Sequence, residues 1–298
     1  MSESARSQAA GNIYDLGYRN YDGPRLGRRY AFVSLFFYTL LSIWGIGRSW
    51  GAKFFPWGLA GISLLPALVL LGVAALAPAE FEVAQPEDYF AFVSIILALF
   101  CAIVSPDLIG RDQRHHALSL YFSRALDRVD YAAAKLAALV VSLFLVLCVP
   151  QVFLQSGNAV ATDDLTGYLQ DNVDVTAPVV VSSALVATFM ASMALAIAIF
   201  TPRRAFATGA VIAAFVILTV IGGILVETLE GDARRYSLLL SPLLIMEGVV
   251  YWVFSVEPPL DSDLTRAGLS MGYYFIAALF YAAAFLAIIY RRIKRMQV

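Results

Sequence analysis

The sequence predicts an all-α integral membrane protein with six transmembrane helices. Hydrophobic residues make up 60% of the 298-residue chain and charged residues only 14%, and the mean hydropathy is +0.74. Several apolar runs are long enough to cross a hydrocarbon core of roughly 30 Å. These runs are continuous rather than alternating, which is typical of membrane helices and not of barrel strands. We therefore expect residues 51–298 to form one six-span helical domain.

The six spans follow from the apolar runs and the polar segments between them. We expect them at about 54–77, 89–104, 132–154, 177–200, 205–226 and 271–290. In the fourth span, alanines recur every three or four residues, which places small side chains on one helix face and allows another helix to approach closely. That face fits packing within the subunit or an interface between subunits. The two cysteines lie inside spans and are expected to pack rather than to form a disulfide.

The positive charges indicate how the spans are oriented. Lys and Arg resist translocation across the membrane, whereas Asp and Glu count for little. If the N-terminus is cytoplasmic and only the six runs cross, the cytoplasmic segments hold all but three of the 21 Lys and Arg residues. The exceptions are Arg234, Arg235 and Arg266. The outer loops collect acidic residues instead, so we expect both termini on the cytoplasmic side.

The apolar stretch 30–46 needs a separate interpretation because basic residues flank it on both sides. Two arginines precede it, and Arg48 and Lys53 follow it, so a crossing would place basic residues outside in either direction. A helix that lies in the inner interface keeps both of its ends in water. We expect a cytoplasmic N-terminal strap over 1–29 and an interfacial amphipathic connecting helix over 30–50. A seventh span is the alternative.

A second apolar stretch, 238–256, is interrupted by Pro242 and carries Glu247. A single crossing here would move the basic C-terminus to the outside. A broken or re-entrant helical element on the outer side, before the last span, satisfies the charge distribution and the proline together. We expect it to act as an outer gate, with Pro242 and Glu247 as its site residues.

The sequence lacks the motifs of a self-sufficient enzyme or pump. It has no phosphate-binding loop of the G-x-x-x-x-G-K-[ST] type and no metalloprotease or serine-hydrolase motif. His115 and His116 are the only histidines, and adjacent residues point in different directions on a helix, so we expect no metal site. Few ionisable residues fall within the spans, which disfavours coupling to an ion gradient. We therefore expect no catalytic residue and no cofactor bound by this chain.

The loop 105–131 carries the clearest functional pattern. Acidic and basic residues alternate there with an amphipathic core of six apolar residues: Leu118, Leu120, Tyr121, Phe122, Leu126 and Val129. A solvated connector is one interpretation. A short amphipathic helix that docks in the groove of a partner protein accounts better for the apolar residues.

This loop resembles the first cytoplasmic loop of the membrane subunits of ABC-2-type transporters. In that family the loop has an acidic residue, a basic stretch, a Leu-rich turn, a P-x-S-R motif, then a Tyr and a Lys. The corresponding residues here are Asp107, Arg111, Asp112, Leu118 to Leu120, Ser123, Arg124, Tyr131 and Lys135. The chain departs from the pattern where Ala125 follows Ser-Arg and where Asp107 replaces the usual Glu. The N-terminal "YDLGYRNYDGPRLGRR" and "GIGRSWGAKFFP" are similar to one branch of the family.

The resemblance implies the permease subunit of an ATP-driven exporter in the cytoplasmic membrane of a prokaryote. Two permease subunits, identical or homologous, would pair with separate ATP-binding-cassette ATPase subunits, which hold ATP and Mg. The partners are then these subunits and membrane lipid, with no nucleic acid. The expected ATPase-coupling residues are Asp107, Arg111, Asp112, Arg114, Leu118, Leu120, Tyr121, Ser123, Arg124 and Arg128. Charge reversal at Arg124 is expected to lower transport-coupled ATPase activity without affecting membrane insertion.

The same resemblance implies that the second and fifth spans line the substrate path. The residues expected there are Phe92, Ile96, Phe100, Thr219, Gly222 and Gly223. A path so poor in charge suits an amphipathic or hydrophobic substrate. Two alternatives stay open: a secondary transporter or channel, and a membrane anchor that recruits a cytosolic partner.

Overall fold

The computed structural model describes residues 23, 26–76, 86–123, 126–160 and 173–295. Side chains are not described at 70, 73–76, 88, 156–160 and 173–174. Most of the predicted strap over 1–29, the loops 77–85 and 161–172, and Arg124 lie outside these ranges. The described part is helical throughout and contains no strand.

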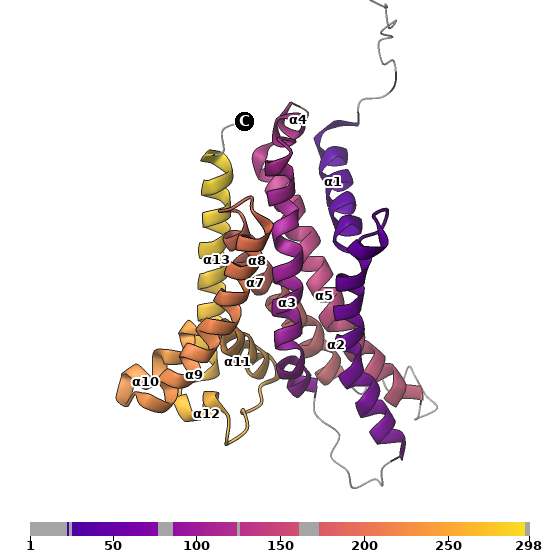
Figure 1. Ribbon diagram of the computed structural model, residues 1–298. Coiled ribbons are helices and arrows are strands. Elements are labelled where there is room, and N and C mark those ends of the chain that lie inside the picture. The colour runs from indigo at the N-terminus through magenta and orange to yellow at the C-terminus, as the bar shows by residue number, and fades with distance from the viewer. Residues whose placement is uncertain (1–22, 24–25, 77–85, 124–125, 161–172, 296–298) are drawn as a thin grey trace, which may run out of the picture.

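The described residues form a succession of helices along the chain. The first half contains α1 (Gly27–Ile43), α2 (Trp50–Leu76), α3 (Pro86–Arg114), α4 (Leu118–Phe122) and α5 (Arg128–Val160). The second half contains α7 (Val173–Ala198), α8 (Arg204–Ile212), the π-helix η1 (Ala213–Ile217), α9 (Leu218–Thr228), α10 (Gly231–Ser237), the 3₁₀ helix η2 (Leu238–Leu240), α11 (Pro242–Phe254), α12 (Asp263–Ala267) and α13 (Met271–Arg295). Figure 1 shows the long helices standing side by side as a bundle.

Six helical segments of the described chain are long and apolar enough to cross a membrane. They are α2, α3, α5, α7, the continuous run α8–η1–α9, and α13. These six candidate spans coincide with the predicted ones and indicate a multi-pass membrane protein, and the bent pair Gly231–Leu240 and Pro242–Phe254 would add a seventh if it crosses as one span. The helices extend beyond the apolar runs, since α3 continues to Arg114 and α5 begins at Arg128. The charged residues at these ends are also compatible with helix. The hydrophobic composition therefore marks the membrane-crossing run, and the helix itself extends beyond it.

The core of the bundle lies around α7, which packs against α3, α5, α11 and α13. Its alanine stripe faces this core: Ala187, Ala191, Ala194 and Ala198 are buried, and Ala184 alone of the five is exposed. Small side chains let the neighbouring helices approach closely. Of the two interpretations of this face, packing within the subunit is therefore confirmed. Both cysteines are buried and unpaired.

Helix α1 covers the predicted apolar stretch 30–46 and packs mainly on α5. It runs in the same direction as the first half of α5: Arg28 pairs with Asp130, and Trp44 shares a groove with Val146. A helix lying flat in the interface would cross the upright α5, whereas α1 runs alongside it (Figure 1). The interfacial placement stays a prediction, and this geometry does not favour a flat orientation.

The predicted break near Pro242 is present as a sharp bend. The segments Gly231–Leu240 and Pro242–Phe254 meet at 97°. The side chain of Ser241 caps α11 by accepting a hydrogen bond from the Leu244 amide at 3.3 Å, and proline suits the first turn of a helix because no amide donor is needed there. The bend lies at the end of the bundle opposite to α4 (Figure 1).

Candidate functional site

The segment 105–131 is mostly helical in the structure. Helix α3 continues through its first ten residues, and α5 supplies the last four, so only 115–127 connects the two helices. The expected amphipathic helix is the short α4, Leu118–Phe122. We call 115–127 the coupling segment. Its helix α4 lies at the same end of the bundle as α1 and the last turns of α13 (Figure 1).

The base of the coupling segment is held by a buried polar cluster. The Lys135 ammonium lies 3.0 Å from the Asp112 carboxylate, and both side chains are largely buried. The Tyr131 hydroxyl donates a hydrogen bond to the same carboxylate at 2.6 Å. A buried charge is tolerated only when it is paired and hydrogen-bonded. The cluster therefore joins the end of α3 to the start of α5.

A second set of contacts joins α3 to the loop before α8. Arg114 donates a hydrogen bond to the Pro202 carbonyl at 2.6 Å. Asp107 lies 3.5 Å from Arg114 and 3.6 Å from Arg204. Gly110 faces the same loop, where an added Cβ would lie 3.5 Å from the Pro202 carbonyl oxygen. The last turn of α3 thus contacts both α5 and α8.

Most apolar side chains of the segment pack against the chain itself rather than facing outward. Leu118 and Leu126 are buried, and the rings of Tyr121 and Phe122 lie 5.4 Å and 5.8 Å from that of Tyr131. Much of this amphipathic pattern is therefore satisfied within the subunit, and docking to a partner stays a prediction.

Two apolar side chains of this set remain outside. Leu120 is 68% exposed and Val129 is 43% exposed. Leu120 lies on α4, at the tip of the connection between α3 and α5. It is the large apolar side chain that α4 leaves exposed.

Three predicted coupling residues remain: Ser123, Arg124 and Arg128. Ser123 is exposed and its hydroxyl bonds the Leu120 carbonyl at 3.0 Å, while Arg124 lies outside the described residues. Arg128 donates to the Lys294 carbonyl at 2.9 Å and its guanidinium lies 5.5 Å from the centre of the Phe122 ring. Arg128 therefore ties the start of α5 to the end of α13 and contacts the coupling segment through the Phe122 ring.

Arg28 joins α1 to the end of the coupling segment and to the start of α5. Its guanidinium lies 2.8 Å from Asp127 and also pairs with Asp130. The hydrogen bond to Asp130 raises the pKa of the guanidinium above its ordinary value. The pair with Asp127 is solvent-exposed on both sides, so it positions α1 more than it stabilises the fold.

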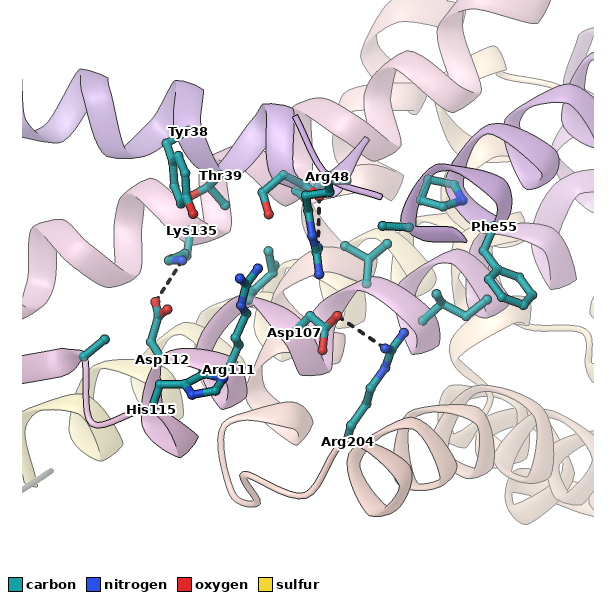
Figure 2. A pocket seen from close by; sticks show the side chains of 18 of the residues that line it. Tyr38, Thr39, Arg48, Phe55, Asp107, Arg111, Asp112, His115, Lys135 and Arg204 are labelled. Atoms are coloured by element: carbon teal, nitrogen blue, oxygen red, sulfur yellow. Dashed lines mark hydrogen bonds and ion pairs between the residues drawn. The ribbon is translucent and has the colours of Figure 1, made fainter. Parts of the chain in front are cut away.

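Behind the coupling segment lies a cavity of about 580 Å³. Its walls are α1, the turn before α2, the first turns of α2, the end of α3, the start of the coupling segment, Lys135 of α5 and Arg204 of α8. Figure 2 shows that Asp107, Arg111 and Asp112 point from α3 into this space, together with Lys135 from α5 and Arg204 from α8. Three predicted ATPase contacts therefore face an interior cavity in this conformation.

The residues predicted for the substrate path do not form one continuous surface. Phe92 is 63% exposed on α3 and Ile96 is half-buried, but Phe100 is fully buried, with its ring 5.9 Å from that of Trp44. Phe100 therefore belongs to the core. A helix in lipid is apolar on every side, so its composition does not separate the exposed face from the buried one.

The fifth-span residues of that prediction pack against the bent element. The Ser241 hydroxyl donates to the Thr219 hydroxyl at 3.0 Å. An added Cβ at Gly222 would lie 3.0 Å from the Ser241 Cβ, and one at Gly223 would lie 3.6 Å from the Asp263 carboxylate. These small residues allow α9 to approach the break between η2 and α11.

At the predicted outer gate, Pro242 is buried at the start of α11 and Glu247 is half-buried one turn further on. The helix that carries them packs on α7 and α13. Gly248 lies directly against Tyr274, where an added Cβ would be 2.6 Å from the ring carbon Cγ. The gate residues are thus part of a tightly packed element.

Sequence reasoning missed two features near this site. Arg48 was used only as a flanking charge, yet it lines the cavity. The π-helix Ala213–Ile217 interrupts the fifth span, and no residue pattern in that uniformly apolar run indicates it. Within the described ranges, no group of three His, Cys, Asp or Glu side chains could hold a metal ion.

In comparisons with known proteins, no family model matches the chain and no curated protein matches its sequence.

Proposed function

We propose that the chain is the transmembrane subunit of an ATP-driven exporter of the ABC-2 type. The observation that carries the proposal is the coupling segment. It is a short helix-bearing connection at the basic end of a six-span bundle, and it carries the exposed Leu120. Its rings pack on Tyr131, and the ends of α3 and α5 that flank it are tied to each other, to the loop before α8 and to α13. Such a segment suits a groove on a cytosolic ATPase that supplies the ATP and Mg sites.

In this proposal the protein transmits motion and performs no chemistry of its own. Closure of the ATPase subunits on ATP displaces α4. Helices α3 and α5 flank the coupling segment and move with it. Because the Asp112–Lys135 pair joins their ends, and the Arg114 and Arg128 hydrogen bonds tie those ends to the loop before α8 and to α13, α8 and α13 follow the displacement. A second permease subunit, identical or homologous, completes the path.

The proposed placement follows the charge sorting. The basic end of the bundle faces the cytoplasm of a prokaryotic cell, with both termini on that side, and α1 connects the N-terminal strap to the first span at the inner interface. The bent element α10–α11 then lies on the outer side as a re-entrant gate. The exposed apolar side chains of α3 and α9, among them Phe92, Ile95 and Val220, favour an amphipathic or hydrophobic substrate.

The test compares two exposed leucines at opposite ends of the bundle. Leu120→Asp alters α4, and Leu260→Asp alters a residue that is 90% exposed near the bent element. Each tagged variant is purified from native membranes in mild detergent, and ATP hydrolysis and azido-ATP labelling are measured in the eluate. Burying a leucine contributes about 1.5–3 kcal/mol, so Leu120→Asp should weaken ATPase binding about 10- to 100-fold.

The control and the alternatives give distinct outcomes. Leu260→Asp should retain the ATPase at the wild-type level. An equal yield of ATPase with Leu120→Asp would contradict the role of α4. Substrate movement by the chain reconstituted alone would favour a secondary transporter or channel, and a partner without an ATP site, released by Leu120→Asp, would favour a membrane anchor.

A further inference from the structure

The cavity behind the coupling segment carries more positive than negative charge. Its lining includes four cationic side chains and two carboxylates: Arg48, Arg111, Lys135, Arg204, Asp107 and Asp112. Both carboxylates are already engaged. Asp112 binds Lys135 and Tyr131, and Asp107 binds Arg204 and Arg114. Both acids of the lining are therefore already paired, and two of its four cations have no carboxylate partner among the described residues of the lining.

The two cations left over are Arg48 and Arg111. In the part of the chain that the structure describes, neither side chain forms an ion pair. Arg48 makes one long hydrogen bond, 3.5 Å, to the Ser42 carbonyl. Arg111 lies close enough to Lys135 for their like charges to repel. Both arginines are half-buried, and a half-buried cation gains from an anionic partner.

The two guanidinium groups enter the cavity from different elements. Figure 2 shows Arg48 extending into it from the turn between α1 and α2, and Arg111 from α3. A planar guanidinium presents paired donors that match the oxygens of a phosphate. The volume of about 580 Å³ lies in the usual range for a small-molecule site. A phosphate between the two arginines would offset the excess charge and join the turn to α3.

The surroundings of the cavity indicate a lipid as the source of that phosphate. Tyr38 and Phe55 line the cavity and are more than half exposed. Trp50 and Phe54, which begin the first span, are also exposed. Exposed aromatic rings beside basic residues at the end of a span are typical of the headgroup level of a bilayer.

We infer that this cavity binds the phosphate of an anionic phospholipid headgroup through Arg48 and Arg111. Tyr38 and Phe55 lie where the headgroup passes into the bilayer. The inference is independent of the proposed exporter function, because it concerns the inner side of α3 and not the partner-facing side of α4. Occupancy would fix the turn between α1 and α2 against α3, next to the Asp112–Lys135 pair.

The test uses three probes on the purified chain in a non-ionic detergent. They are dioctanoyl phosphatidylglycerol, dioctanoylglycerol, which lacks the phosphate, and glycerol phosphate, which lacks the acyl chains. Binding is followed by native mass spectrometry and by the shift of the thermal unfolding midpoint. Phosphatidylglycerol should bind and raise the midpoint in proportion to its occupancy, and the other two probes should bind at least tenfold more weakly.

The matched variants are Arg48→Gln and Arg111→Gln in the cavity and Arg203→Gln outside it. Arg203 is an exposed arginine of the same end whose guanidinium lies over the Phe206 ring. A charge-assisted hydrogen bond is worth enough for each cavity variant to lose about 10- to 100-fold in affinity, while Arg203→Gln should bind as the wild type does. Arg111→Lys keeps the charge without the planar fork and should recover part of the affinity.

Three results would overturn the inference. Equal weakening by Arg203→Gln and Arg111→Gln would mean that the lipid senses only the overall charge of this end. Equal binding of dioctanoylglycerol would assign the interaction to the acyl chains. Equal binding of glycerol phosphate would overturn the lipid assignment in favour of a soluble phosphate. Gel-filtration profiles of all variants exclude misfolding, and Arg48→Gln, on a turn, tests the site separately if Arg111→Gln does not fold.

Discussion

The buried pair Asp112–Lys135 allows the anchoring of the coupling segment to be tested quantitatively. The Lys135 side chain is 5% exposed and that of Asp112 is 14% exposed, with 3.0 Å between the charged atoms. Asp112→Leu leaves the ammonium buried without a carboxylate, which costs about 3–5 kcal/mol. It also removes the acceptor of the Tyr131 hydroxyl, which adds about 1–3 kcal/mol. A typical total stability of about 5–15 kcal/mol makes this a large fraction.

The matched variants are Lys135→Met and the double variant Asp112→Leu/Lys135→Met. Lys135→Met should also destabilise, because it leaves the carboxylate without its cation. Replacing both charges removes the uncompensated ion, so the double variant should lie within about 2 kcal/mol of the wild type. The exposed residue Asp127 provides a control: Asp127→Ala breaks only a solvated pair and should leave stability unchanged.

The assay is reversible unfolding in mixed micelles with increasing anionic detergent, followed by circular dichroism. The double-variant cycle gives the coupling free energy between the two sites. We expect at least about 3 kcal/mol, the cost of the uncompensated charge. A double variant as unstable as the sum of the two single variants would refute the reasoning, because the two side chains would then act independently.

Two further predictions follow from the packing and from the two ends of the bundle. Gly248→Ala should lower the free energy of unfolding by about 1–3 kcal/mol, because the added methyl group overpacks against Tyr274. Gly209→Ala, where the methyl group meets open space, should not. Equal stability of both variants in the unfolding assay would contradict the close contact of α11 and α13. Ser119→Cys and Asp261→Cys, at exposed positions of opposite ends, should react with a membrane-impermeant maleimide from opposite sides, and labelling of both from one side would refute the topology.

The spans could be predicted because the membrane constrains each one locally. A continuous apolar run must form a helix to satisfy its own backbone, so no knowledge of neighbouring helices was needed. Because a span is apolar on every side, its sequence does not indicate which face is buried. Phe92 and Phe100 are identical residues eight positions apart on α3, yet the first is exposed and the second fully buried, and no polar stripe distinguished them.

The coupling segment was located from its charges, but its contacts depended on the tertiary structure. Asp112 and Lys135 belong to different helices, and their pairing requires α3 and α5 to be adjacent. The apolar pattern of α4 also fits a docking face, because the sequence does not show that the rings of Tyr121 and Phe122 pack on Tyr131, in the first turn of α5. A pattern of apolar residues shows that a face is covered, and it does not show whether the chain itself or another protein covers it.

The arrangement of these contacts indicates how motion would cross the proposed exporter. The ends of α3 and α5 that flank the coupling segment are fixed to each other, to the loop before α8 and to the end of α13, so in the proposed exporter a displacement of α4 would be passed on to these helices. The fifth span is different, because the π-helix Ala213–Ile217 replaces the regular hydrogen-bond ladder in its middle, and such turns are sites of kinking and function. Directly after it, Thr219 and Gly222 contact Ser241 at the 97° bend. The path α8–η1–α9 therefore leads from the loop that Arg114 of α3 contacts to the bent element, through a span whose middle is a π-helix.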